Sequence, residues 1–169
     1  TLSVSDTPKV TDTLIELFKI DMETGKATAQ GNASLEGAEF TWNFYAGYYT
    51  ADNLPSEPTR TWTTKTLAEK DSDGTVHYVS RLADKYKVSG DSFYTQDGAA
   101  VLPLGTLTVE ETKSPSGYLL EGAYMQAAGS EEQITGLYIT QITEDGELAV
   151  LTGSNQFSVS DKVIRGGVQ

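Results

Sequence analysis

The feature that most constrains the fold of this 169-residue chain is a repeated alternation of apolar and polar residues in short segments. A period of two is the period of a β-strand, because successive side chains of a strand point to opposite faces. The clearest alternating segments are residues 14–20, 39–45, 105–112, 137–142 and 156–161. Turn-forming sequences rich in Gly, Asp and Ser lie between them. The pattern predicts an all-β fold, a β-sandwich or a barrel, of about one domain.

The composition excludes several classes of function. The chain has 24 Asp plus Glu against 12 Lys plus Arg, a net charge of -12 that would repel nucleic acid and anionic membranes. It has no Cys, so disulfides, thiolate metal sites and Cys nucleophiles are excluded. The single His, His77, excludes a multi-histidine zinc site. We expect no metal, no cofactor, and neither nucleic acid nor membrane as a partner.

An internal repeat bears on domain organisation. The sequence LSVSD at residues 2–6 matches FSVSD at residues 157–161. A tandem array explains the match, with residues 1–9 as a linker or closing strand of a preceding repeat. The domain itself would then cover residues 10–163, and residues 164–169 would begin the linker to a following repeat. Chance similarity of two strands rich in Val and Ser is the alternative.

Three charged residues fall on apolar strand faces: Lys19, Glu111 and Asp161. Their apolar neighbours at period two are, respectively, Ile15 and Leu17, Leu107 and Val109, and Phe157 and Val159. A charged group on an apolar face must be paired, neutralised or consumed in a reaction. Exposed charges at strand ends and an unreacted buried salt bridge are the alternatives.

Several sequence motifs resemble a known family. Residues 18–26 read FKIDMETGK and residues 35–40 read LEGAEF, close to the opening pattern K-x-D-x-x-T-G-K, then L-x-G-A-x-F. Residues 109–118, VEETKSPSGY, resemble an E-box, E-T-x-x-P-x-G-Y, and residues 157–161 are similar to a closing strand. In this order the motifs resemble Cna-B-type, or SpaA-type, prealbumin-like domains. The resemblance implies an inverse-Ig β-sandwich, in which residues 42–100 form an enlarged middle region.

The resemblance also implies an intramolecular isopeptide bond between a first and a last strand. By position, Lys19 would be the nucleophile, Asp161 the electrophile and Glu111 the catalytic carboxyl group. Burial favours the neutral amine and the neutral acid, which is the reactive combination. Asp161 stands where Asn is commoner, so the leaving group would be water. Asn155 is a second candidate acceptor, but its spacing from the apolar alternation is wrong.

The function implied is structural rather than enzymatic, since the cross-link forms once. We expect a stalk or repeat domain of a Gram-positive cell-wall surface protein, adhesin or pilin-like. It would be extracellular and attached to the cell wall through an anchor outside this fragment. Its partners would be neighbouring repeats of the same polypeptide, with a host glycan or an extracellular matrix protein as a further partner.

The alternative is a carbohydrate- or host-protein-binding module that uses the aromatic-rich residues 40–62. Its candidate ligand-binding residues are Tyr45, Tyr48, Tyr49 and Trp62. Phe40, Trp42 and Phe44 alternate toward the core and would not be available to a ligand.

Overall fold

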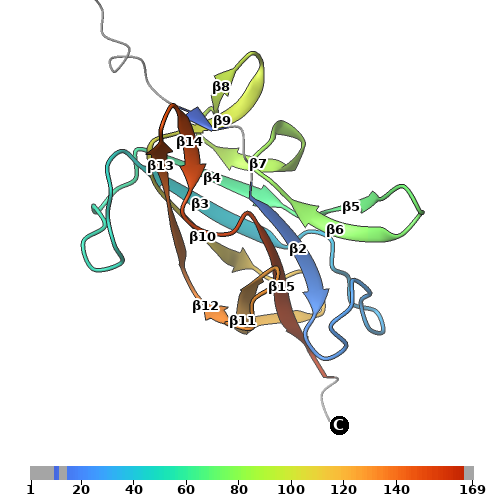
Figure 1. The fold of residues 1–169 in the computed structure, drawn as a ribbon. Coiled ribbons are helices and arrows are strands. Elements are labelled where there is room, and N and C mark those ends of the chain that lie inside the picture. The colour runs from blue at the N-terminus through green and yellow to red at the C-terminus, as the bar shows by residue number, and fades with distance from the viewer. Residues whose placement is uncertain (1–9, 12–14, 166–169) are drawn as a thin grey trace, which may run out of the picture.

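The computed structural model describes residues 10–11 and 15–165, and these residues form β-strands joined by turns and loops (Figure 1). Within these ranges there is one 3-10 turn, η2 (Asp84–Tyr86), and no α-helix. The all-β prediction is confirmed. No helix among the described residues is long and apolar enough to cross a membrane. The proposed linkers lie outside the described residues, except for residues 164–165.

The strands form two six-stranded sheets and one three-stranded sheet. The first sheet has the order β14 (Leu148–Leu151), β13 (Tyr138–Asp145), β10 (Gly105–Lys113), β3 (Glu39–Tyr45), β4 (Arg60–Lys65) and β7 (Lys87–Gly90). The second has the order β12 (Ile134–Thr135), β11 (Tyr118–Ala127), β15 (Gln156–Val163), β2 (Glu16–Asp21), β6 (Val76–Ser80) and β5 (Leu67–Lys70). The small sheet has the order β1 (Val10–Thr11), β9 (Ala99–Pro103) and β8 (Tyr94–Gln96).

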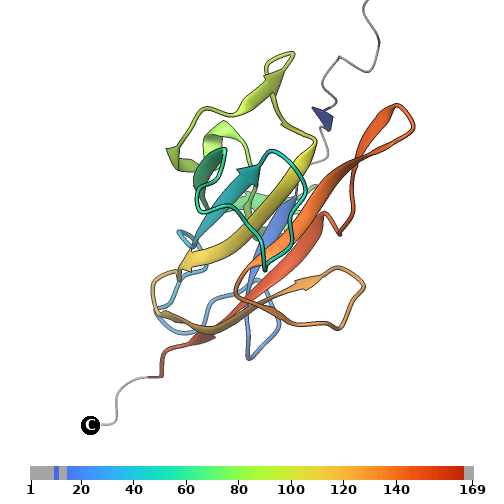
Figure 2. The ribbon, with the colours of Figure 1, turned by 90° about the vertical axis from the view of Figure 1, so that its left-hand side faces the viewer.

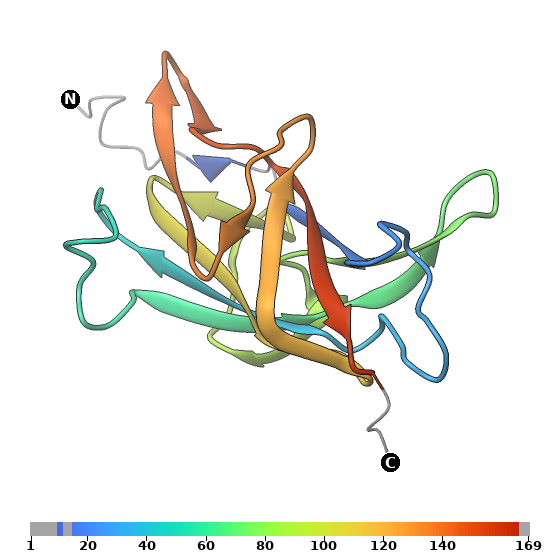
Figure 3. The same cartoon turned by 90° about the horizontal axis from the view of Figure 1, so that it is seen from below.

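The two large sheets pack against each other and enclose the apolar core, an arrangement consistent with a β-sandwich; Figures 2 and 3 show it from two further sides. Both sheets contribute to one cluster of buried side chains, among them Leu17, Phe40, Trp42, Phe44, Leu107, Val109, Phe157 and Val159. The alternating segments predicted from the sequence supply these residues, because their apolar faces point inward.

The region between residues 42 and 100 is built into both large sheets. It supplies β4 and β7 to the first sheet and β5 and β6 to the second. Its last strands, β8 and the first two residues of β9, belong to the small sheet. This region therefore widens the sandwich rather than forming a separate module.

A buried polar contact joins the two large sheets. The indole nitrogen of Trp42 donates to the hydroxyl oxygen of Thr64 on β4 at 2.8 Å. The hydroxyl of Ser80, on β6 of the opposite sheet, donates to the same oxygen at 2.7 Å. Trp42, Thr64 and Ser80 are all fully buried, so these groups have no access to water as a substitute partner.

We expect Thr64→Val to destabilise the fold by about 1–3 kcal/mol, because the Trp42 and Ser80 donors would be left buried without an acceptor. Urea unfolding monitored by tryptophan fluorescence measures this change. Thr63→Val, one residue earlier and only half-buried, is the control and should change stability by less than about 0.5 kcal/mol. Equal effects of the two substitutions would contradict the assignment.

Candidate functional site

The three charged residues singled out from the sequence lie together between the sheets. Lys19 is on β2, Asp161 is on the neighbouring strand β15, and Glu111 is on β10 of the opposite sheet. Strands β2 and β15 are parallel, with Lys19 in register with Val159 and Asp161 in register with Asp21. The side chains of Lys19 and Asp161 are 0% exposed and that of Glu111 is 4% exposed.

The amine of Lys19 contacts both carboxyl groups. Its Nζ lies 2.7 Å from Oδ1 of Asp161 and 3.6 Å from Oε2 of Glu111. It donates a hydrogen bond to the backbone carbonyl of Val159 at 3.1 Å. Over the described part of the chain, none of the four carboxyl oxygens has a partner at hydrogen-bonding geometry. Nζ of Lys19 is therefore at contact distance from Asp161, but the angles are not those of a hydrogen-bonded ion pair.

Glu111 is a protonated acid at neutral pH. Burial and the neighbouring Asp161 carboxyl group raise the pKa of Glu111, the Lys19 amine lowers it by less, and the net result is a pKa of about 9. A neutral Glu111 can donate its proton to an oxygen of Asp161, which an ionised carboxylate cannot do. The site thus places a buried amine, a carboxyl group in contact with it and a neutral acid side by side.

A cavity of about 290 Å³ adjoins the carboxyl group of Glu111. It lies beside β10, β11 and β12, and its lining includes Glu111, Val159, Leu120, Met125 and Ile134. Leu120, Met125, Ile134 and Val159 supply apolar lining, and the cavity provides room for water next to Glu111.

Asp21 and Tyr118, which belong to the motifs at residues 18–26 and 109–118, adjoin this site. Asp21 is 0% exposed and follows Lys19 at period two on the same face of β2. Tyr118, on β11, donates its hydroxyl to Oδ2 of Asp21 at 2.6 Å. The alternation of β2 was the available signal, since it continues from Ile15 and Lys19 to residue 21.

The turn before β11 has a backbone that only Gly adopts readily. Gly117 has φ of +85°, and a Cβ there would lie 2.5 Å from the Cβ of Ala33. This close approach brings the loop before Tyr118 against the loop that contains Gln30.

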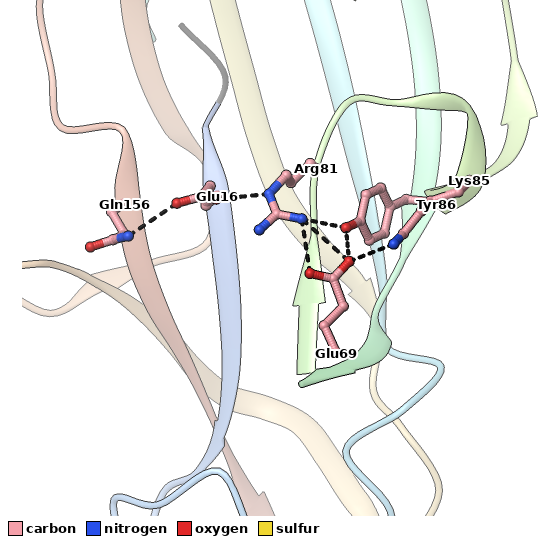
Figure 4. A network of polar contacts seen from close by, with 6 residues as sticks. All are labelled: Glu16, Glu69, Arg81, Lys85, Tyr86 and Gln156. Atoms are coloured by element: carbon pink, nitrogen blue, oxygen red, sulfur yellow. Dashed lines mark hydrogen bonds and ion pairs between the residues drawn. The ribbon is translucent and has the colours of Figure 1, made fainter. Parts of the chain in front are cut away.

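A second polar network holds the other end of β2 and β15 (Figure 4). Glu16 accepts hydrogen bonds from Arg81 at 2.8 Å and from Gln156 at 3.0 Å, so it bridges β15 to the segment after β6. Arg81 also pairs with Glu69, which contacts Lys85 and Tyr86. Burial would raise the pKa of Glu69, but the hydrogen bonds from Lys85, Tyr86 and Arg81 lower it to about 2.

The aromatic residues proposed as a ligand platform do not form one. Trp62 is 1% exposed and pairs across the sheet with Trp42, so the alternation of β4 directs it into the core. Tyr45 is also buried, and Tyr49 is half-buried with its ring edge against Tyr45. Tyr48 is 50% exposed, although its hydroxyl donates to a backbone carbonyl of β13. The placement of Trp62 and Tyr45 on a binding surface is therefore wrong.

The described residues include no cluster of three or more His, Asp or Glu side chains arranged to hold a metal ion. In comparison with known proteins, the chain matches no family model and no curated sequence. The functional argument therefore rests on the geometry of Lys19, Glu111 and Asp161.

We expect the stability of Lys19→Met, which cannot form a cross-link, to fall as the pH rises from about 5 to about 9. The pKa of Glu111 is about 9 in the folded chain, above its ordinary value of 4.5, so its protonated form is the one that folding favours. The contribution of Glu111 to the free energy of unfolding is complete below its ordinary pKa of 4.5 and is lost as the pH approaches its raised pKa of about 9. The slope should reach up to about 1.4 kcal/mol per pH unit.

Urea unfolding at a series of pH values measures this dependence. Lys19→Met/Glu111→Gln is the control and should show a much flatter dependence over the same range, because an amide does not titrate. Parallel curves for the two variants would show that Glu111 is not the group responsible.

Proposed function

We propose that this chain contains a Cna-B-like structural domain of a bacterial surface protein, stabilised by an isopeptide bond between Lys19 and Asp161. The observation that carries the proposal is the 2.7 Å contact between Nζ of Lys19 and Oδ1 of Asp161, made in a fully buried site beside Glu111. Reacting groups held about 3–3.5 Å apart reach effective molarities that no bimolecular reaction in water matches.

The proposed reaction is a condensation. The neutral amine of Lys19 attacks the carboxyl carbon of Asp161, forming a C–N bond. A C–O bond of the carboxyl group then breaks, and the oxygen leaves as water with two protons, one of them from the amine. The products are a secondary amide and one water molecule, so no oxidant, metal or cofactor takes part.

Glu111 would act as the acid and base of this reaction. Its proton can be donated to the oxygen of Asp161 while negative charge develops there, and its carboxylate can then accept a proton from the attacking nitrogen. Glu111 would end the reaction in its starting form, whereas Lys19 and Asp161 would be consumed, so the chain would cross-link itself once rather than act as an enzyme. The cavity beside Glu111 gives the departing water a place to move into.

The benefit to the protein would be mechanical. The bond would join β2, the first strand of the second sheet along the chain, to β15, the last strand of the described residues. Strand β1 and the end of β15 lie at opposite ends of the molecule (Figure 1). This arrangement suits a domain that transmits tension along a stalk of tandem repeats, extracellular and attached to the cell wall. Adjacent repeats of the same polypeptide would be its partners.

The binding-module alternative has less support. Two of its four candidate residues, Tyr45 and Trp62, are buried, and Tyr48 is the most exposed of them. A hollow of about 690 Å³ does lie over β2, β5 and β6, but four of its charged or titratable residues form pairs, Arg81 with Glu69 and His77 with Asp71.

We expect the denatured wild-type protein to have a mass about 18 Da below that of its sequence, the mass of the water lost. Glu111→Gln keeps the shape of the site without an ionisable acid and should retain the full mass, as should Lys19→Met. Fragment-ion analysis of a protease digest should find the residues around Lys19 and Asp161 in one branched peptide. A wild-type mass equal to that of the linear chain would refute the cross-link.

We expect Glu111→Gln to lower the free energy of unfolding by about 5 kcal/mol, because the cross-link closes a loop of more than about 100 residues in the unfolded chain. Denaturant unfolding compares it with the wild type. Glu110→Gln is the matched control, since Glu110 precedes Glu111 on β10 and is only half-buried. That variant should keep both the bond and nearly all of the stability, and a comparable loss would point to a general effect of altering β10.

A further inference from the structure

Asp21 is a second buried carboxylate, held by a set of donors that leaves it ionised. Its oxygens accept hydrogen bonds from the Tyr118 hydroxyl at 2.6 Å and from the Gln30 side chain at 3.0 Å. The backbone amides of Glu23 and Thr24 donate at 2.8 and 3.0 Å. Burial would raise the pKa of Asp21, but these hydrogen bonds together lower it. Asp21 therefore carries a negative charge throughout the neutral range.

The register of the strands places this charge next to Asp161. Asp21 is directly opposite Asp161 on the parallel pair β2 and β15, and both side chains are 0% exposed. Neighbouring strands lie about 4.8 Å apart, so the two residues are neighbours on the inner face of the sheet, in a medium that screens charge poorly. The amine of Lys19 lies 2.7 Å from Oδ1 of Asp161 and donates to the carbonyl of Val159, two residues earlier on β15.

Ionisable groups on three strands face Asp161. From β2 it is faced by Lys19 and by the ionised Asp21, from β10 by Glu111, and from β11 by Tyr118. Glu111 is protonated at neutral pH, and the pKa of Tyr118 is raised by burial and by its hydrogen bond to Asp21, so Tyr118 remains a neutral donor. Asp21 is thus the fixed charge among them.

We propose that Asp21 is a positioning residue of the cross-linking reaction, whose negative charge keeps the shared proton on Asp161 rather than on Lys19. Two carboxylates side by side in the core repel each other, so the ionised form of Asp161 is disfavoured where Asp21 is already charged. The proton that Lys19 and Asp161 share then resides on the acid. This leaves the amine neutral and nucleophilic and makes the carboxyl carbon electrophilic. The inference rests on the proposed isopeptide bond.

The test is the pH dependence of the rate of bond formation. Chains purified in urea and never allowed to fold are linear. They are refolded by dilution at pH values from about 5 to about 10, and samples are denatured in acid at intervals. Intact mass gives the fraction that has lost water. Removing a negative charge lowers the affinity of nearby groups for protons, so the profile of Asp21→Asn should shift to lower pH by about one unit. Its maximal rate should be about tenfold lower.

Tyr118→Phe is the matched control, because it removes a hydrogen bond to Asp21 but leaves the charge. It is expected to react more slowly at every pH without a shift of the profile. A second pair of variants changes the charge around Asp21 without altering Asp21 itself. Gln30 is half-buried and donates to Asp21, so Gln30→Lys places a cation against that carboxylate. Gln30→Met removes only the hydrogen bond. Gln30→Lys should shift the profile in the same direction as Asp21→Asn, and Gln30→Met should not.

This pair keeps the test decisive if Asp21→Asn fails to refold. Asp21 would be only a structural residue if the profiles of Asp21→Asn and Gln30→Lys superimposed on that of the wild type. The same would follow if these variants reacted more slowly without a shift of the profile. In that case the wild type still loses water and the proposed function stands. A wild-type chain that never loses water would instead overturn the proposed function and this inference with it.

Discussion

The interaction on which the structure depends is the burial of one lysine amine between two carboxyl groups. Removing an ionised amine and an ionised carboxylate from water costs several kcal/mol for each ion, even after relaxation. Lys19 has one hydrogen bond to compensate this loss, to Val159, and its contact with Asp161 lacks hydrogen-bonding geometry. The raised pKa of Glu111 shows how the site limits the cost, because a neutral acid is easier to bury than its anion.

Such a site requires that β2 and β15 keep their register. A slip of one residue would turn Lys19 to the outer face of the sheet and leave Asp161 without a partner. Polar contacts hold the pair at both ends: Glu16 bridges Arg81 and Gln156 at the start (Figure 4), and the amide of Met22 donates to the carbonyl of Asp161 at 2.9 Å near the end. The register is thus fixed by groups outside the three that would react.

The sequence predicted the strands with a regular alternation but not those whose residues are similar on both faces. The segment 39–45 was predicted with the bounds of β3, since Phe40, Trp42 and Phe44 alternate with polar residues. Strand β4 was missed, because threonines lie on both faces of it and only Trp62 and Thr64 point inward. The same periodicity that placed Lys19, Glu111 and Asp161 inward could not reveal Asp21 as a fixed charge. That property depends in part on the hydroxyl of Tyr118, which is 97 residues away in the sequence.

The unreacted site also explains why condensation would be favourable in a protein surrounded by water. In solution, an amine and a carboxylic acid are stabilised as hydrated ions, and this hydration opposes amide formation. The fold has already removed that hydration from Lys19 and Asp161, whose side chains are 0% exposed. Forming the amide replaces two buried ionisable groups by one neutral group, which is easier to bury. The free energy that makes the unreacted core unfavourable would therefore drive the bond.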